Sequence, residues 1–242
     1  LYALQHGGQE SGGIATYRNG LMNVKRGDGL LMNIFKPADF EHLNGNIGIG
    51  HVRYSTTGSG DFQNVQPIIA RFWGGMIGLS HNGNIVNARE LRNELIDRGA
   101  LIRSSSDTEV LLHLIAAQPN HDITSAILSA LHRVSGAYSL VMVAGDRLVA
   151  VRDPFGFRPL CIGKIYQGYV IASESTALDI IDAEFVRDVR PGELVEIEGT
   201  ELRSTRFGNG ERNATCVFEY IYFARADSVI DGIEVYEVRK RM

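Results

Sequence analysis

The order of apolar segments along the chain restricts its fold more than any other feature of the sequence. Short apolar or alternating segments, bounded by glycine or asparagine as strands often are, lie at 48–54, 67–72, 76–80, 138–144, 148–152, 160–165 and 169–172. A helical block separates the third of these segments from the fourth. A parallel sheet would need strands and helices in regular alternation, so this order predicts an α+β domain in which antiparallel sheets pack on each other and helices cover them.

The helical block carries its own start signals. Asn87 and Glu90 have the spacing of a capping box, which predicts a helix at 88–98. The same spacing recurs a little further on and places Asp107 in the first turn of a second helix. A third helix is expected within 122–134, where apolar residues recur at helical spacing.

Charge and composition indicate a soluble globular domain. The chain has 242 residues, 44% of them hydrophobic, which is enough to bury a sizeable core. Its 24 Lys and Arg residues and 28 Asp and Glu residues give a net charge of −4, and no basic run is long enough to follow a nucleic-acid backbone. No apolar stretch reaches the roughly 18 residues of a membrane span, and no signal peptide is expected. We therefore expect a cytoplasmic protein without a nucleic-acid or membrane partner.

Cysteine usage limits the chemistry that the chain can perform alone. Cys161 and Cys216 are the only cysteines, and they are far apart without a Cys-X-X-Cys motif. This pattern supports neither a disulfide framework nor a complete metal site. Cys161 lies within an apolar segment, so we expect a small core residue rather than a nucleophile.

Polar residues that could carry chemistry lie where the expected strands end. Arg53 could bind a substrate carboxylate in a bidentate pair with Thr56 adding a hydrogen bond, although a surface ion pair explains Arg53 as well. Asn82-Gly83 is a strong tight-turn dipeptide, but its side-chain amide and backbone N–H could also bind one oxyanion. Asp107 either interacts favourably with the helix dipole or accepts hydrogen bonds from a substrate ammonium group.

Other polar residues have simpler interpretations. The segment 153–159, with two prolines and a glycine, indicates a rigid turn outside the site. His6, His51 and His81 are not paired in sequence with a nucleophile or with metal-ligand spacing, so buried or turn histidines are expected.

Several segments, taken in order, resemble the class II glutamine amidotransferases, whose nucleophile is N-terminal, and most closely the amidophosphoribosyltransferase branch of that family. They lie at 1–6, 50–58, 80–84, 105–110 and 152–160. The segment 219–225 also looks like the junction between the glutaminase and phosphoribosyltransferase domains of that branch, which its sister enzymes lack. The resemblance covers nearly the whole chain.

The resemblance implies a fold, a division into domains and a reaction. The fold would be the four-layer αββα sandwich of Ntn hydrolases, with a glutamine amidotransferase domain at 1–213 and a junction at 214–242 that leads into a phosphoribosyltransferase domain outside this chain. The reaction would be hydrolysis of glutamine to glutamate and ammonia. In the full-length enzyme the ammonia converts phosphoribosyl pyrophosphate to 5-phosphoribosylamine, the first step of de novo purine synthesis.

The family's motifs also imply roles for residues of this chain. By position, Arg53 and Thr56 match the residues that bind the α-carboxylate of glutamine, and Asp107 matches the partner of its α-ammonium. Asn82 and Gly83 match the oxyanion hole. The nucleophile would be an N-terminal cysteine upstream of the position matching Leu1, so we expect the sequence printed above to be inactive alone.

The resemblance bears on cofactors too, and the chain departs from the family at one site position. Gly7 stands where the family usually has an arginine near the glutamine site. Cys216 stands where one branch has a ligand to a 4Fe-4S cluster, whose other three ligands would lie outside this chain. No cofactor is therefore expected in this chain alone, whereas the full-length enzyme would use Mg²⁺, could hold the cluster and would form a homo-oligomer.

Two other interpretations stay open. Another class II amidotransferase, of the glucosamine-phosphate synthase or glutamate synthase type, would supply ammonia to a different acceptor, and the segment 219–228 weighs against it. A non-catalytic glutamine-binding module is favoured by Gly7 and by the absence of the nucleophile from the printed sequence.

Overall fold

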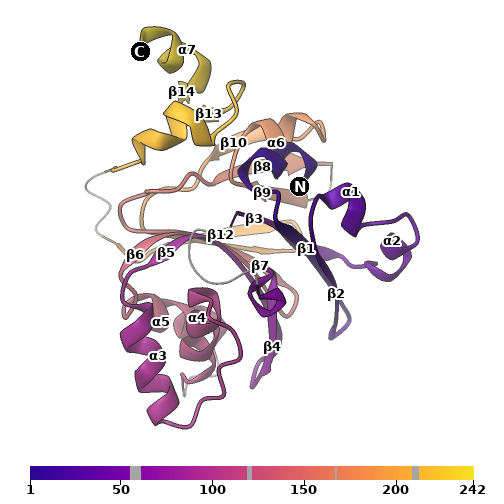
Figure 1. The fold of residues 1–242 in the computed structure, drawn as a ribbon, viewed down its shortest axis with the longest axis vertical. Helices are drawn as coiled ribbons and strands as arrows, with labels where there is room; N and C mark the ends of the chain where they lie inside the picture. The colour runs from indigo at the N-terminus through magenta and orange to yellow at the C-terminus, as the bar shows by residue number, and fades with distance from the viewer. Residues whose placement is uncertain (55–60, 119–121, 167, 209–212) are drawn as a thin grey trace.

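A six-stranded antiparallel sheet lies at the centre of the molecule (Figure 1). The computed structural model describes residues 1–54, 61–118, 122–166, 168–208 and 213–242. The strand order is β12-β11-β7-β6-β5-β4. The strands are β4 (Ile68–Phe72), β5 (Gly75–Ile85), β6 (Gly136–Ala144), β7 (Arg147–Arg152), β11 (Glu193–Glu198) and β12 (Glu201–Arg206).

Three helices cover one face of this sheet and form the largest core with it (Figure 1). They are α3 (Ala88–Asp97), α4 (Asp107–Ala116) and α5 (Ile123–Leu131). Leu114 of α4 and Ile127 of α5 belong to the same buried cluster as Leu79, Leu140 and Val149 of the sheet. Burial of these apolar faces is the main favourable contribution to this layer.

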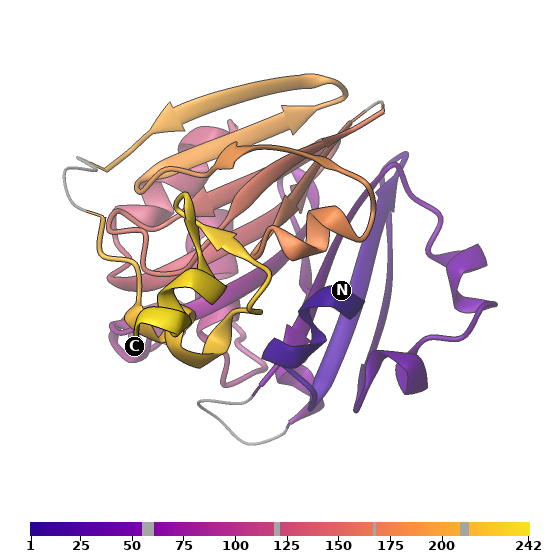
Figure 2. The same ribbon diagram turned by 90° about the horizontal axis from the view of Figure 1, so that it is seen from above.

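Two three-stranded antiparallel sheets pack against the opposite face. One has the order β2-β1-β3, with β1 (Ser11–Arg18), β2 (Leu21–Asp28) and β3 (Ile47–Arg53). The other has the order β10-β8-β9, with β8 (Cys161–Ile165), β9 (Gly168–Ala172) and β10 (Glu184–Asp188). In Figure 2 the indigo and purple strands β1 to β3 form a separate sheet at one side of the molecule.

Side chains alternate between the two faces of each central strand, so the same sheet contributes to a hydrophobic core on either side. Leu140 and Met142 of β6 face the helices, whereas Val143 packs with Ala15 and Ile49 of the second layer. Successive side chains of a strand point to opposite faces, so strands that are buried on both faces are apolar throughout.

Three short helices, α1 (Leu31–Ile34), α2 (Asp39–His42) and α6 (Thr176–Asp179), lie on the outside of the second layer. Two further short helices are η1 (Tyr2–Gly7), which lies beside β3, and η2 (Phe62–Asn64), whose Asn64 binds Ser105 just before α4. Leu178 of α6 packs on Cys161 and Ala172, and Ile34 of α1 lies against Gly27 of β2. The four-layer αββα architecture is thus confirmed, although its second sheet layer is divided into two sheets.

The C-terminal segment 213–242 forms a small unit at one end of the molecule (Figure 1). It contains η3 (Glu219–Phe223), β13 (Val229–Ile230), β14 (Ile233–Glu234) and α7 (Val235–Arg241). Ala224, Ile230 and Val235 form a hydrophobic cluster of their own. Asp231 binds the buried Arg152 of β7, which fixes this segment to the central sheet. The division between domains at 213 and 214 stays a prediction.

The structure contradicts one capping prediction and supplies two hairpins that the sequence analysis missed. The side chain of Asn87 does not cap α3; it donates to Arg133 O and accepts from Ser135 N, which connects α3 to the turn after α5. Asp107 does begin α4, as predicted. The hairpins β1–β2 and β11–β12 were missed because β2 and β12 are largely exposed and polar, so their apolar alternation is weak.

None of the helices in the described ranges is long and apolar enough to cross a membrane.

Candidate active site

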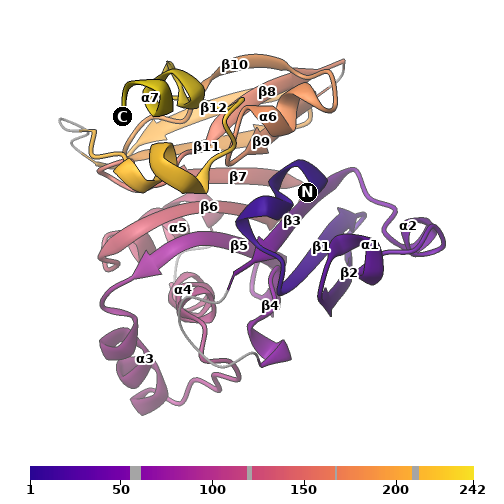
Figure 3. The same ribbon diagram turned by 45° about the horizontal axis from the view of Figure 1, so that its top comes forward.

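A cavity of about 1000 Å³ opens at the end of β5. Its lining comes from η1, β3 and β5, from the first turns of α3 and α4, and from residues near 158, 174 and 219–223. Figure 3 shows η1 beside β3, so the N-terminal segment closes one side of this region. Of the expected site residues, Arg53, Asn82, Gly83 and Asp107 all line the cavity. Thr56 lies outside the described residues.

Asn82 and Gly83 lie inside β5 and do not form a tight turn, so the turn interpretation was wrong. They pair with Ser139 and Tyr138 of β6 in regular antiparallel register. Gly83 has a φ of +148°, and a Cβ there would stand 2.0 Å from the carbonyl oxygen of Ala137. Only glycine fits this position, because both the dihedral angle and the close approach exclude a side chain.

The backbone N–H of Gly83 points away from β6. In antiparallel pairing, backbone groups face one neighbouring strand and then the other at alternate residues. His81 N donates away from β6 to Gln66 Oε1 at 2.6 Å, and Ile85 N donates away from β6 to Asp107 Oδ2 at 3.0 Å. The Gly83 amide lies between these two on the same edge and points toward the cavity.

The side chain of Asn82 lies on the opposite face of β5 from His81, because successive side chains alternate. His81 faces the helices, as Leu79 does, so Asn82 faces the second sheet layer. Asn82 is half-buried and lines the cavity. An oxygen held near this edge of the strand could accept one hydrogen bond from the Asn82 amide and another from the Gly83 N–H, which is the arrangement of an oxyanion hole.

Asp107 presents a charged carboxylate at the cavity wall. Its Oδ2 accepts from Ile85 N, and its Oδ1 lies 3.4 Å from Nδ1 of His81. Burial by itself raises the pKa of Asp107, but the hydrogen bonds from His81 and from the amides of Ile85 and Thr108 outweigh burial and lower it. The carboxylate therefore stays ionised at neutral pH and can receive a cationic group.

Arg53 is the last residue of β3 and brings a positive charge to the cavity wall, as Arg89, Arg92 and Arg158 also do. The N-terminal segment runs beside it: Glu10 N donates to Arg53 O, and Gly8 lies so close that a Cβ there would stand 2.6 Å from the Arg53 backbone. Leu1 and Gly7 also line the cavity. The chain before β1 is thus positioned by β3 at the mouth of the cavity.

The histidines are more involved than the sequence analysis expected. His81 is only 4% exposed and contacts Asp107, and His51 Nε2 donates to His81 O at 3.1 Å. Burial lowers the pKa of His51 to about 4, with smaller contributions from the charges of His81 and Arg53, so His51 is neutral at pH 7. His81 is therefore a buried histidine, as predicted, whereas His51 is half-buried and its ring binds the backbone of β5 at His81.

Three further residues at the cavity were not identified from the sequence. Gln66 binds the backbone of His81, and Arg92 of α3 donates to the carbonyls of Ser104 and Ser106 at 2.6 and 2.8 Å, just before Asp107. Arg158 lines the cavity although its segment had been expected outside the site. The Gln66–His81 and Arg92–Ser106 contacts join residues 15 and 14 positions apart, a separation at which no local sequence pattern indicates a contact.

Acidic residues connect the cavity wall to the C-terminal segment. Glu174 pairs with His6 at 2.7 Å through one oxygen and accepts from Arg225 N and Ser228 Oγ through the other. Arg158 pairs with the buried Glu219, and its guanidinium lies 4.7 Å from the centre of the Phe223 ring. The segment 213–242 is thus part of the cavity wall.

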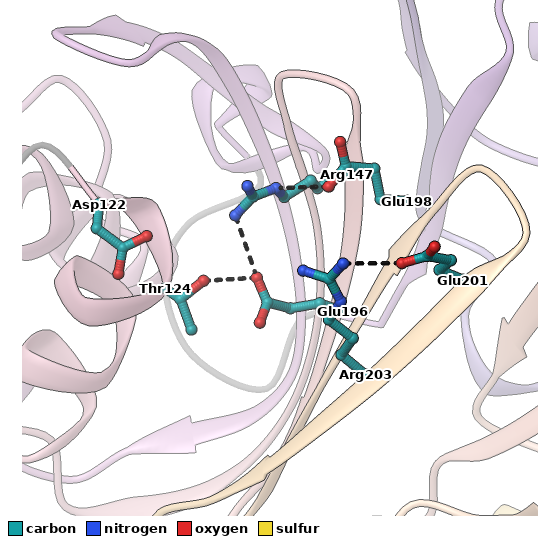
Figure 4. Close-up of a pocket in the computed structure, with 7 residues that line it drawn as sticks. All are labelled: Asp122, Thr124, Arg147, Glu196, Glu198, Glu201 and Arg203. Carbon is teal, nitrogen blue, oxygen red and sulfur yellow. Dashed lines mark hydrogen bonds and ion pairs between the residues drawn. The ribbon is translucent and has the colours of Figure 1, made fainter.

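A second, smaller pocket of about 220 Å³ lies between the start of α5 and the β11–β12 hairpin (Figure 4). It is densely charged, but its charged groups bind one another. Arg147 pairs with Glu196 and Glu198, and Arg203 pairs with Glu201. We interpret this pocket as a surface ion-pair network.

The two cysteines lie outside the cavity lining. Cys161 is buried, as predicted, and burial raises the pKa of its thiol to about 12, so a thiolate does not form. Cys216 is half-buried, and its backbone N–H donates to Phe157 O. Across the part of the chain that the structure describes, no three His, Cys, Asp or Glu side chains are grouped to hold a metal ion.

Comparison with known proteins identifies the family. The sequence profile of the glutamine amidotransferase domain matches residues 51–180. The amidophosphoribosyltransferase of Archaeoglobus fulgidus is 47% identical over 244 residues, which cover 100% of this chain and 53% of that protein. The amidophosphoribosyltransferase of Bacillus subtilis is 40% identical over 243 residues and is covered to 51% of its length. This chain spans about half the length of the curated relatives it matches.

A solved structure agrees with the sequence comparisons. Glutamine phosphoribosylpyrophosphate amidotransferase from B. subtilis, in complex with ADP and GMP, superposes with a TM-score of 0.93 at 39% identity, over 99% of this chain and 52% of that one. The profile, the αββα fold and the cavity at β5 agree, and the chain belongs to the glutamine amidotransferase domain family. Membership of this family implies glutamine as the substrate, and the full-length relatives named above are amidophosphoribosyltransferases.

Proposed function

We propose that this chain is the glutaminase part of an amidophosphoribosyltransferase. It hydrolyses the side-chain amide of glutamine to glutamate and ammonia. The observation that carries the proposal is the edge of β5, where Gly83 presents an inward-facing amide in the same cavity as the Asp107 carboxylate. A second domain of the full-length protein would use the ammonia to displace pyrophosphate from phosphoribosyl pyrophosphate.

The residues of the cavity are suited to bind an α-amino acid. Arg53 pairs with the α-carboxylate of glutamine, with Thr56 adding a hydrogen bond, and Asp107 accepts from the α-ammonium. A cation and an anion on the cavity wall match the two opposite charges of a free amino acid. The side-chain amide of glutamine then extends toward Asn82 and Gly83.

The chemical step requires a thiol from the residues that precede Leu1 in the full-length protein. Leu1 itself lines the cavity. The thiol sulfur attacks the amide carbon, and the carbonyl oxygen becomes an oxyanion that accepts hydrogen bonds from Asn82 and Gly83. The α-amino group of the N-terminal cysteine takes the thiol proton and passes it to the leaving nitrogen, so that collapse of the tetrahedral intermediate breaks the C–N bond and releases ammonia. Water then hydrolyses the thioester to glutamate and regenerates the thiol.

Two alternatives make different predictions. A class II amidotransferase of another type would form glutamate but would not form phosphoribosylamine from phosphoribosyl pyrophosphate. A non-catalytic module would bind glutamine and form no glutamate. The integration of 213–242 into the cavity wall through Glu174 and Glu219 favours the amidophosphoribosyltransferase assignment, because this segment carries the junction resemblance.

The decisive experiment uses the natural full-length protein. Intact mass and N-terminal sequencing establish whether a cysteine precedes the segment that begins at Leu1. Glutamate release from glutamine, and phosphoribosyl pyrophosphate consumption in the presence of Mg²⁺, are then measured on the same sample. Glutamate formation that supports phosphoribosylamine synthesis is the expected result, and glutamine binding without glutamate formation would overturn the proposal.

We also propose that Cys216 supplies one thiolate to a 4Fe-4S cluster in the full-length protein, with three ligands from outside this chain. Its partial exposure next to the junction leaves the sulfur accessible to residues beyond 242. Iron and acid-labile sulfide in the purified full-length protein, both lost in Cys216→Ser, would support this role. A full-length protein without iron would exclude it.

A further inference from the structure

We propose that Gln66 is a positioning residue for the Gly83 amide. Its side-chain carboxamide takes the place of a strand partner for β5 at the point where β4 stops, and so holds the Gly83 N–H toward the cavity. The inference rests on the proposed function, because the Gly83 amide matters only if an oxyanion forms there.

The register of the sheet shows what Gln66 replaces. Strands β4 and β5 pair from Phe72 with Gly75 to Ile68 with Leu79. Two residues further, the same register would set Gln66 opposite His81, but β4 begins only at Ile68. In a continued ladder, the backbone of Gln66 would accept from His81 N and donate to His81 O.

The side chain of Gln66 makes these two bonds in place of its backbone. Gln66 Oε1 accepts from His81 N at 2.6 Å, and Gln66 Nε2 lies 3.4 Å from His81 O. A carboxamide has the same donor and acceptor pair as a peptide group, so it can extend the ladder by one residue. His51 Nε2 gives His81 O a second donor at 3.1 Å.

The backbone around Gln66 is itself held in place. The guanidinium of Arg26, from β2, donates to Val65 O at 2.7 Å and lies 3.4 Å from Pro67 O. The carbonyl of Gln66 faces Gly13 of β1, where a Cβ would approach it to 2.3 Å. Gln66 is only 7% exposed. The carboxamide therefore has little freedom to leave His81.

Two side chains thus fix β5 on either side of Gly83. Gln66 binds His81, two residues before Gly83, and Asp107 binds Ile85, two residues after it. If Gln66 released His81, the strand could rotate about the flexible Gly83 and turn its N–H away from the cavity. Because misplacing a donor weakens its interaction with the transition state more than substrate binding, kcat would change and KM would not.

The test uses the full-length protein with two changes at Gln66 and one matched control. Gln66→Glu keeps the size of the side chain but replaces the donor to His81 O by an acceptor. Gln66→Met removes both hydrogen bonds without adding charge. Gln63→Glu places the same new carboxylate three residues away, on an exposed side chain of η2. For each variant, kcat and KM for glutamate release, glutamine binding and thermal unfolding are measured.

We expect kcat to fall about 10- to 100-fold in both Gln66 variants, with KM and the glutamine Kd within about threefold of the parent. Gln63→Glu should retain the parent kcat. A fall in the melting temperature with unchanged kcat per folded molecule would show that Gln66 is only structural and would overturn the proposal. Absence of glutamate release from the parent itself would instead reject the proposed function, so the two failures are distinguishable.

Discussion

Two pockets of this molecule, the cavity at the end of β5 and the charged pocket beside β11, both contain ion pairs, but the cavity also has a backbone donor, the Gly83 N–H, that points inward. In the charged pocket, Arg147 of β7 and Arg203 of β12 are paired with glutamates of the β11–β12 hairpin, so both guanidinium groups already have partners. In the cavity, the neighbours of Gly83 are bound by Gln66 and Asp107 while the Gly83 amide points inward.

The comparison shows that the density of charge does not locate the site. A group that already has a partner must give up that partner before it can bind a ligand, so a paired pocket gains little from one. A donor that is held in place and points into a cavity incurs no such cost. The predictions below compare the two regions, from the largest expected effect to the smallest.

Gly83→Ala should abolish most of the glutaminase activity of the full-length protein. The new Cβ would stand 2.0 Å from Ala137 O at a φ of +148°, so β5 has to move. Displacing an oxyanion-hole donor lowers kcat by at least about 100-fold. Gly75→Ala is the control, because its φ is +106° but a Cβ there meets no described atom within 4 Å. A Gly83→Ala protein with the parent kcat would remove Gly83 from the site.

Asp107→Asn should weaken glutamine binding. The carbonyl of asparagine can still accept from Ile85 N, but the negative charge for the α-ammonium is lost. A hydrogen bond to a charged group contributes about 1.5–3 kcal/mol, which corresponds to an increase of roughly 10- to 100-fold in KM. Asp122→Asn makes the same change at the charged pocket, where the carboxylate caps α5. Equal effects of the two variants on KM would contradict the conclusion that the cavity, and not the charged pocket, binds glutamine.

His51 should make the protein less stable as the pH falls from 6.5 toward 4. The folded-state pKa of His51 is about 4, mainly because of burial, and lies below the unfolded value of 6.5. The unfolded chain therefore binds more protons in this window, and the free energy of unfolding decreases with decreasing pH by an amount on the order of 2 kcal/mol. Urea unfolding of the parent and of His51→Gln at several pH values measures the contribution of His51 to the free energy of unfolding. The free energy of unfolding should depend less on pH in the variant. If the two proteins show the same pH dependence, His51 is not the group responsible.

Gly7→Arg should lower KM for glutamine modestly. Gly7 is exposed at the cavity, and a Cβ there would meet no described atom within 4 Å, so the arginine can be accommodated. A solvent-exposed charge pair contributes about 0.2–1 kcal/mol, which is a change in KM of up to about fivefold. Gly168→Arg in β9 adds the same charge away from the cavity and serves as the control. An increase in KM at Gly7 would show that the new side chain obstructs the substrate.

Glu198→Gln should have the smallest effect. The Glu198 side chain is 57% exposed, and its pair with Arg147 is a surface ion pair. Such pairs contribute about 1 kcal/mol or less to stability. Denaturant unfolding should show a change within that range, and glutamate release should match the parent. A loss of turnover comparable to that of Asp107→Asn would mean that the charged pocket contributes to the reaction.

The sequence predicts the layers of the fold well where apolar periodicity is strong. The strands β6 and β7 and the helices α3 to α5 were expected within a few residues, because both faces of the strands or one face of each helix are buried. The expected segment 76–80 covers only the first half of β5, which runs to Ile85. Asn82-Gly83 was given as a turn by default because this dipeptide favours turns, and β6, more than 50 positions later in the chain, keeps it in a strand. The long-range pairing with β6 therefore overrides the local preference of Asn82-Gly83 for a turn.

The resemblance to a family indicated Arg53, Asn82, Gly83 and Asp107, which the structure places in one cavity. It did not indicate Gln66. A glutamine before a proline carries no local signal, and its contact with His81 depends on the register between β4 and β5. Residues that position others through long-range contacts, as we propose for Gln66, are therefore difficult to identify from the sequence.

Glu174 joins residues made early and late during translation. It pairs with His6 near the N-terminus and with Arg225 and Ser228 near the other end. A ribosome synthesises the chain from its N-terminus, so His6 emerges long before the partners that complete this contact. On a nascent chain the cavity wall therefore stays incomplete until residue 228 has left the ribosome exit tunnel. The cavity wall is therefore completed later than the central sheet, whose last strand, β12, ends at Arg206.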